Sequence, residues 1–211
     1  TQVVYHDYDS APLIFETRGL PKAKKFQEND WGKNMNTPDE FPEESGIGIV
    51  VVCEGGSVYT NARGDVLMKD ADGNIIDSPE AYETEDIFTN FISAVKSRKV
   101  EEQYADCEET HISSALCHTG LISHRLGRLL SNEEILEQIK DDATLTERYE
   151  SMSDHLGKNG VDVTDESIVL GPMLKFNPDT EWAEGNGDLD EPANRLATRV
   201  YREPFVVPEV L

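Results

Sequence analysis

The sequence predicts an α+β fold with a largely antiparallel, open-faced sheet and helices packed on one side. Up to residue 76, apolar and polar residues alternate in short runs separated by turn signals, as they do in paired strands. From residue 87 the apolar period changes to 3.6 residues, as in helices. Strands followed by helices, rather than strands alternating with them, are typical of the α+β class.

The first two strands are expected near residues 2–7 and 13–18. A short polar segment ending in Pro12 separates them, so the pair is interpreted as a β-hairpin with His6 as an ordinary strand residue. Residues 21–45 are polar, contain several prolines and have few aliphatic side chains. We expect a long loop there, and loops of this length inside compact domains are usually functional or mobile.

Two more hairpins are expected between residues 47 and 76. The first has an apolar strand at residues 47–53 and turns at Gly55-Gly56, because glycine tolerates the positive φ angles of a tight turn. The second turns at Asp72-Gly73, which is a strong hairpin signal. We further expect one face of this sheet to be flat and apolar and to mediate self-association, since exposed apolar patches mark interfaces. The residues that suggest this face are Val50, Val52, Val58 and Tyr59.

The second turn also has the acidic spacing of a calcium loop, with Asp70, Asp72 and Asn74 at alternate positions. An EF-hand loop needs glycine at its sixth position and glutamate at its twelfth. Here Gly73 is at the fourth position and Ala81 at the twelfth, so the pattern favours a plain turn.

Helices are expected in the second half of the chain. An apolar stripe covers residues 87–95, and a longer helix at residues 108–126 ends before Gly127. Two capping-box patterns open further helices, because a Ser or Thr followed three residues later by Glu satisfies the free N–H groups of a first turn. These patterns are Ser131 to Glu134 and Thr144 to Glu147. A short apolar run at residues 167–170 and an acidic, glycine-rich loop at 177–192 complete a single domain, residues 1–211.

Composition narrows the possible functions. The net charge is -23, from 42 acidic and 19 basic residues, so a nucleic acid would be repelled. No apolar run approaches the roughly 18 residues that suggest a membrane span. The chain begins at Thr1 directly in strand-like sequence, from which we expect a fragment of a longer protein, and no signal indicates its compartment. Cys53 and Cys117 are expected to pack as small apolar residues; with Cys107 they give an odd number and no CxxC motif.

The helix at residues 108–126 carries the candidate site. His111, Ser114, His118 and Arg125 are separated by three, four and seven residues, which places them on one face of a helix. Such a face could be the polar wall of a substrate pocket, or an ordinary face toward solvent or an interface. Histidines seven residues apart are poorly placed to bind zinc together, so no metal site is expected.

Sequence motifs that mark other active sites are missing. There is no GxSxG, although a hydrolase with an unrecognised site stays possible, and there is no phosphate-binding GxxxxGK[ST]. Gly46 and Gly48 do not begin a dinucleotide motif, because Val51 occupies the third glycine position. We therefore expect this chain alone to bind neither NAD nor NADP.

An ordered set of segments resembles the C-terminal domain of Gfo/Idh/MocA oxidoreductases, in the bacterial branch common in planctomycetes. The resemblance extends from about residue 12 to the end of the chain. One departure is Leu121, where many relatives carry asparagine. The segments are Gly55-Gly56-Ser57-Val58-Tyr59, residues 88–99, 111–118 and 122–127, Phe176-Asn177-Pro178, Ala193-Asn194-Arg195-Leu196 and residues 201–205.

The resemblance implies an open-faced sheet domain that shapes a substrate pocket and forms an oligomer interface. It also implies a parent protein that uses NAD or NADP on a sugar or polyol. The nucleotide-binding domain of the family, with its glycine-rich turn, Glu-Lys-Pro lysine and following catalytic histidine, has no counterpart here. The alternative is a binding or assembly module of the same fold that does not catalyse a reaction. Whether the chain belongs to an enzyme therefore stays open at this point.

Overall fold

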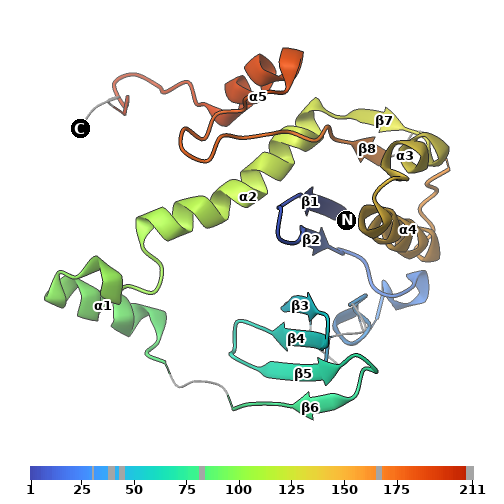
Figure 1. The fold of residues 1–211 in the computed structure, drawn as a ribbon, viewed down its shortest axis with the longest axis horizontal. Coiled ribbons are helices and arrows are strands. Elements are labelled where there is room, and N and C mark those ends of the chain that lie inside the picture. Colours follow the sequence, from blue (N-terminus) through green and yellow to red (C-terminus); the bar gives the residue numbers. More distant parts are fainter. Residues whose placement is uncertain (30, 38–40, 43–45, 81–83, 165–167, 208–211) are drawn as a thin grey trace. The chain divides into compact units, whose positions relative to one another are not determined.

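A computed structural model describes residues 1–29, 31–37, 41–42, 46–80, 84–164 and 168–207. The chain divides into two compact units. Unit one consists of Thr1–Tyr104 and Ile139–Val163, and unit two of Ala105–Gln138 and Thr164–Leu211. Figure 1 shows the order of the elements along the chain. Helices and antiparallel strands both contribute, so the predicted α+β class is confirmed. Within the described residues, however, the strands form three sheets rather than the one continuous sheet expected.

Unit one begins with the hairpin of β1 (Gln2–His6) and β2 (Leu13–Thr17), as predicted. The segment that follows contains two short 3₁₀ turns, η1 (Lys24–Phe26) and η2 (Trp31–Lys33). Helix α4 (Ala143–Lys158) packs against β1 (Figure 1). This helix begins after Asp142, whose carboxylate accepts a hydrogen bond from the Leu145 backbone N–H at 2.8 Å. The predicted cap at Thr144 is therefore wrong: Thr144 already lies inside the helix, and Asp142 satisfies the free N–H group.

The four-stranded sheet of unit one has the order β3-β4-β5-β6. Its members are β3 (Ile49–Cys53), β4 (Gly56–Thr60), β5 (Val66–Asp70) and β6 (Ile75–Asp77). Both predicted hairpins are present. The first turn uses Glu54 and Gly55, while Gly56 begins β4, where a side chain would collide with the Lys69 carbonyl. At the second turn, the Asp70 carboxylate accepts backbone hydrogen bonds from Asp72 and Asn74. Asp70 therefore stabilises the turn, while Ala81 lies outside the described residues.

The register of this sheet separates its two faces. Val50, Tyr59 and Leu67 are cross-strand neighbours on one face, and Val51, Val58 and Met68 on the other. Tyr59 is buried on the first face, where its ring packs 5.0 Å from the Phe41 ring, whereas Val52 at the edge of that face is 77% exposed. The expected apolar face was therefore wrong in its residues: it combined side chains from both faces. The face left open carries Ile49, Val51, Val58, Val66 and Met68.

The remaining helix of unit one is α1 (Ile87–Ser97), which is followed by the 3₁₀ turn η3 (Val100–Glu102). The Asp86 carboxylate caps α1 by accepting hydrogen bonds from the backbone N–H groups of Phe88 and Thr89. The helix buries Asn90 and Ala94. Its predicted apolar stripe is exposed, with Phe88 74% and Phe91 56% accessible.

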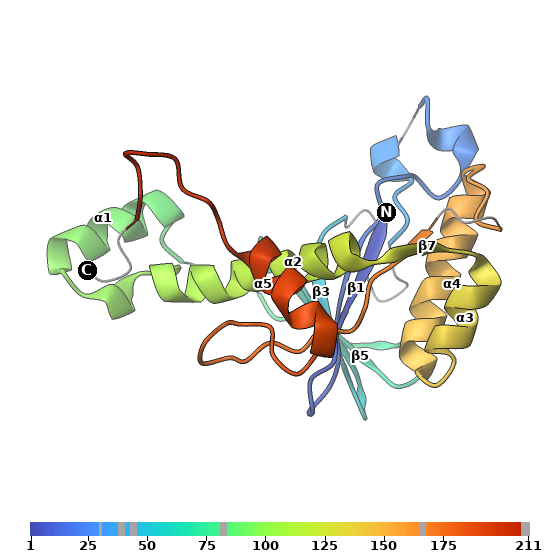
Figure 2. The same cartoon turned by 90° about the horizontal axis from the view of Figure 1, so that it is seen from above.

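Unit two is built around α2 (Cys107–Leu126), a helix of 20 residues. Helix α5 (Asp190–Ala197), which follows the short turn η4 (Gly187–Leu189), packs on the C-terminal half of α2 (Figure 2). Between them Ile122, Ala183 and Ala193 form a small buried core. Gly127 ends α2 as predicted, for a different reason: its φ is -74° and an added Cβ would lie 2.6 Å from the Leu170 carbonyl oxygen.

Three shorter elements are also present in the described residues of this part of the chain. Strand β7 (Arg128–Leu130) pairs antiparallel with β8 (Ile168–Leu170), which begins just after Ser167, a residue outside the described ones. Helix α3 (Asn132–Ile139) has the predicted capping box. The backbone N–H of Ser131 donates to the Glu134 carboxylate, and the Glu134 N–H donates back to the Ser131 hydroxyl. The capping box in the local sequence was therefore sufficient to predict the start of α3.

Candidate functional site

Helix α2 presents all four predicted site residues to solvent. His111, Ser114, His118 and Arg125 are each exposed, and the helix is regular over its full length. The Asp106 carboxylate starts the helix by accepting a hydrogen bond from the Glu109 backbone N–H at 2.9 Å. Glu108 and Glu109 in the first turn and His124 and Arg125 in the last turn complement the helix dipole. The four residues therefore lie on one regular helix, as predicted, but the face that they share is exposed to solvent.

A shallow hollow of about 340 Å³ lies at the start of α2. Of the four candidates, His111 and Ser114 line it, whereas His118 and Arg125 do not. The structure thus brings together two of the predicted residues and leaves two further along the helix. The other lining residues are Ala105, Asp106, Cys107 and Thr110.

His111 already has a partner inside unit two. Its Nε2 donates to the carboxylate of Glu181, with 2.7 Å and 2.8 Å to the two oxygens. Glu181 belongs to a tight loop in which its own N–H donates to the Asn177 carbonyl at 2.7 Å. Both side chains are more than half exposed, so this contact contributes little to stability. The hydrogen bond orients the imidazole and, in the neutral ring, places the proton on Nε2.

The other three candidates are less constrained by side-chain contacts. The Ser114 hydroxyl donates to the Thr110 carbonyl at 2.8 Å, one turn back on the same helix. For His118 and Arg125, no side-chain hydrogen bond or ion pair to another described residue is found. This exposed stretch can therefore recognise hydroxyl or carboxylate groups only together with another surface that encloses it.

Cys107 is the residue at this hollow that sequence reasoning missed. It is an exposed, free thiol one helical turn before His111. The signal was present in the sequence, since Asp106 caps a helix and positions four apart share a face. Cys53 and Cys117 are also exposed, which corrects the expectation that they pack as apolar residues. Most residues of β3 are exposed, and on α2 both Cys117 and the neighbouring His118 are exposed.

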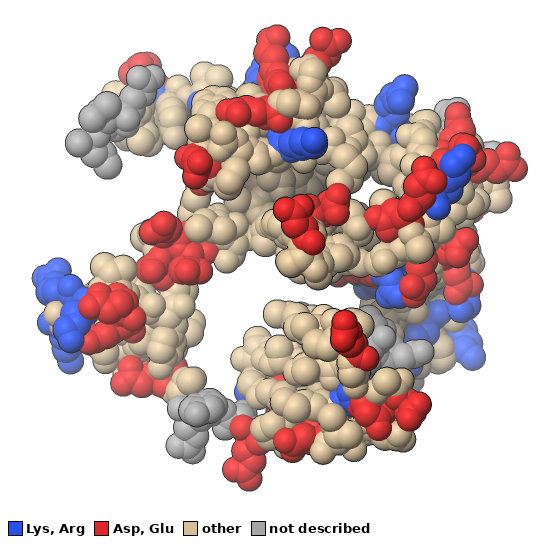
Figure 3. All heavy atoms as spheres, viewed as in Figure 1, with Lys and Arg blue, Asp and Glu red and all other residues tan. Residues whose placement is uncertain are grey.

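The described residues also bear on metals and membranes. Among them, no group of three or more His, Cys, Asp or Glu side chains is arranged to hold a metal ion. None of their helices combines the length and the apolar character needed to cross a bilayer. Figure 3 shows many acidic side chains on the visible face, together with smaller groups of basic side chains.

Comparisons with protein-family models, with curated proteins and with solved structures each find no match to this chain.

Proposed function

We propose that this chain is the substrate-binding and assembly part of an NAD(P)-dependent oxidoreductase of the Gfo/Idh/MocA type, which acts on a sugar or polyol. The observation that carries the proposal is the open apolar face of the four-stranded antiparallel sheet. Ile49 is 61% exposed and Val51 52% exposed on that face. An uncovered apolar sheet is what the sequence resemblance implies, and such a surface favours association with another protein surface.

Assembly is assigned to this open face and to a second copy of the chain. Side chains of Val51, Val58 and Met68 form an apolar row across three strands. In a chain with a net charge of -23, two copies repel each other except where charge-free surfaces meet. The apolar row of the open face provides such a surface, with Asp77 at its border beside Met68.

Substrate binding is assigned to the polar face of α2. His111 and Ser114 line the hollow, and His118 and Arg125 extend the same helix face with a ring nitrogen and guanidinium donors. These groups suit the hydroxyls of a polyol or a sugar acid. In the parent protein, the nucleotide-binding domain would supply NAD or NADP and the enclosing wall.

One observation favours the second candidate, an assembly module that does not catalyse a reaction. The His111 ring is already hydrogen-bonded to Glu181. The side chains of His118 and Arg125 form no hydrogen bond or ion pair with a described residue that would fix their orientation. Catalytic groups are normally held in place before substrate arrives.

The decisive experiment begins with the coding sequence upstream of Thr1. The proposal expects a βαβ segment with a GxGxxG turn there, and hydride transfer between NAD or NADP and a polyol in the full protein. His118→Ala should lower kcat/KM by about 5- to 150-fold, since unpairing a polar group in the enclosed pocket of the parent protein costs about 1–3 kcal/mol. His124→Ala is the matched control, because His124 lies on another side of α2.

Two results would decide against the catalytic proposal. A start codon near Thr1, together with no hydride transfer, would leave the assembly module as the function. Unchanged kinetics in a folded His118→Ala protein would remove His118 from the site.

Assembly is tested separately by two variants of adjacent residues. Val51→Asp places a charge on the open face and should convert a dimer to a monomer in light scattering. Val52→Asp, on the opposite face and 77% exposed, should leave the dimer intact. A strictly monomeric wild-type chain at high concentration would refute self-association without bearing on hydride transfer.

A further inference from the structure

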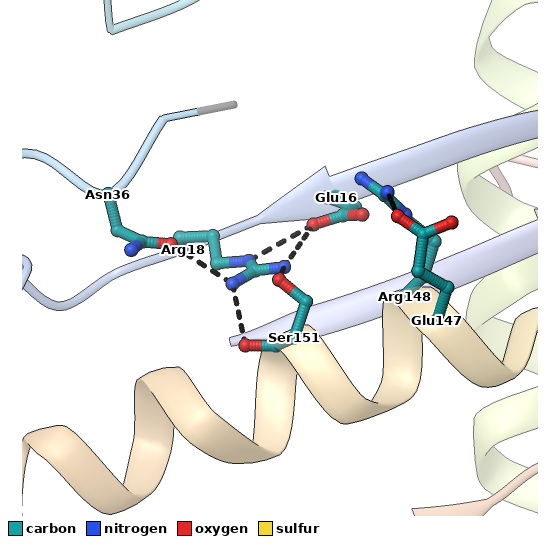
Figure 4. A network of polar contacts seen from close by, with 6 residues as sticks. All are labelled: Glu16, Arg18, Asn36, Glu147, Arg148 and Ser151. Atoms are coloured by element: carbon teal, nitrogen blue, oxygen red, sulfur yellow. Dashed lines mark hydrogen bonds and ion pairs between the residues drawn. The ribbon is translucent and has the colours of Figure 1, made fainter. Parts of the chain in front are cut away.

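Helix α4 is attached to the first hairpin and its following loop by polar contacts at several points. The Arg18 guanidinium, just after β2, donates to the Ser151 carbonyl at 3.1 Å and to the Ser151 hydroxyl at 3.2 Å (Figure 4). Near the other end, the Asn159 amide donates to the Pro21 carbonyl at 2.8 Å. Tyr149 and Met152 are buried on this helix.

His155 lies on α4 in the middle of this attachment and is 1% exposed. Neither of its ring nitrogens has a hydrogen-bond partner among the described residues. A neutral imidazole has one donor and one acceptor, and no described residue satisfies either of them. A protonated ring would have two donors and a positive charge to satisfy, and burial without an acceptor makes that charged form costly.

The charges around His155 make protonation still less favourable. The Arg18 guanidinium, the amino group of Thr1 and Lys158 are positive neighbours, whereas Asp154 is the one negative neighbour on α4 that acts on the ring. Glu16 partly neutralises Arg18, with 2.7 Å between the guanidinium and the carboxylate. Burial first, and then Arg18, lower the pKa of His155 below its ordinary value.

We propose that His155 makes the docking of α4 on the β1–β2 hairpin depend on pH, so that acid releases the helix. The ring is neutral while α4 is docked, and it takes up a proton readily once the helix separates and water reaches it. Because the released state binds this proton more tightly than the docked state, lowering the pH shifts the docking equilibrium toward release.

The direction of the effect follows from the two states of the ring. The docked state has the lower His155 pKa, so its stability is fully present above about 6.5, the ordinary histidine value. It falls as the pH drops below that value and is lost as the pH passes through the lower pKa. For one linked proton, the docking equilibrium changes at most about tenfold per pH unit in this window.

Nuclear magnetic resonance of the whole chain tests the first step directly. The Cε1–H resonances of the five histidines are followed from pH 8 to pH 4, with four assigned by single variants and that of His155 by elimination. We expect His155 to titrate at lower pH than His118 and His124, which are exposed. Titration of His155 together with these two would overturn the proposal, and this measurement needs no variant of His155 that folds.

Amide hydrogen exchange tests the second step. After correction for intrinsic exchange, protection of α4 should fall by up to about tenfold per pH unit below pH 6.5. His155→Leu should flatten this dependence, while His124→Gln should keep it. His6→Gln should also keep it, which controls for the half-buried His6, whose pKa burial likewise lowers. Equal protection of α4 at pH 7 and pH 5 in the wild-type chain would refute release.

Discussion

The Nε2 of His111 lies 2.7 Å from one carboxylate oxygen of Glu181 and 2.8 Å from the other, across 70 residues of sequence. A side chain expected to face a substrate is thus already bound to a loop of its own chain. Glu181 holds this position with a φ of 59°, in the left-handed region that favours glycine. The backbone of the loop is therefore strained at Glu181, the residue that contacts α2.

Two substitutions at Glu181 separate the backbone strain from the ion pair. Glu181→Ala and Glu181→Gly both remove the contact with His111, but only glycine relieves the left-handed conformation. We expect the glycine variant to be more stable than the alanine variant by about 0.5–1 kcal/mol in urea unfolding. The reverse order would show that the loop changes conformation once the ion pair is lost.

Gly48 is required by the packing of Tyr59. An added Cβ would lie 2.4 Å from the Tyr59 ring and 2.9 Å from the Thr60 carbonyl oxygen. Gly48→Ala should therefore destabilise unit one by about 1–3 kcal/mol, as overpacking does. Gly55→Ala, where no atom lies within 4 Å of the added carbon, should change stability by less than about 0.5 kcal/mol. Equal thermal melts for the two variants would contradict this account.

Ser131 and Thr144 have the same sequence signature but different roles. Ser131 caps α3 through reciprocal hydrogen bonds with Glu134, whereas Thr144 is an exposed residue within α4. Ser131→Ala should cost about 1 kcal/mol. Thr144→Ala should be neutral or slightly stabilising, because alanine has the higher helix propensity. Denaturant titrations of both variants make the comparison, and a large loss at Thr144 would restore it as a cap.

Tyr5 should titrate unusually late. Its hydrogen bond to Asp142, together with burial and the nearby charges of Asp142 and Asp7, raises the pKa of Tyr5 to about 12. Stability from this contact is therefore fully present below about pH 10, the ordinary tyrosine value, and is lost as the pH rises through about 12. Asp142→Asn should bring the Tyr5 titration, followed by tyrosine Cζ resonances, toward pH 10.

Asp7→Asn is the control for this experiment, since Asp7 is the last and smallest of the causes. It should shift the Tyr5 titration less than Asp142→Asn does. If both variants shift it equally, general negative charge rather than the hydrogen bond sets the pKa of Tyr5.

The sequence by itself determined the local elements. The three predicted hairpins in the first 77 residues follow from alternation and turn residues, and the start of α3 follows from a capping box four residues long. The end of α2 was marked by Gly127. Such features depend on interactions between residues close in sequence, so the pattern is sufficient to predict them.

Only the tertiary structure decided which surfaces are covered and which side chains meet. The Phe41 ring packs on Tyr59 and helps to bury it, β7 pairs with β8, which begins at residue 168, and Glu181 is hydrogen-bonded to His111. The burial of His155 likewise depends on where α4 docks. Periodicity shows that an element has an apolar face, but the partner of that face is chosen by packing between segments far apart in sequence.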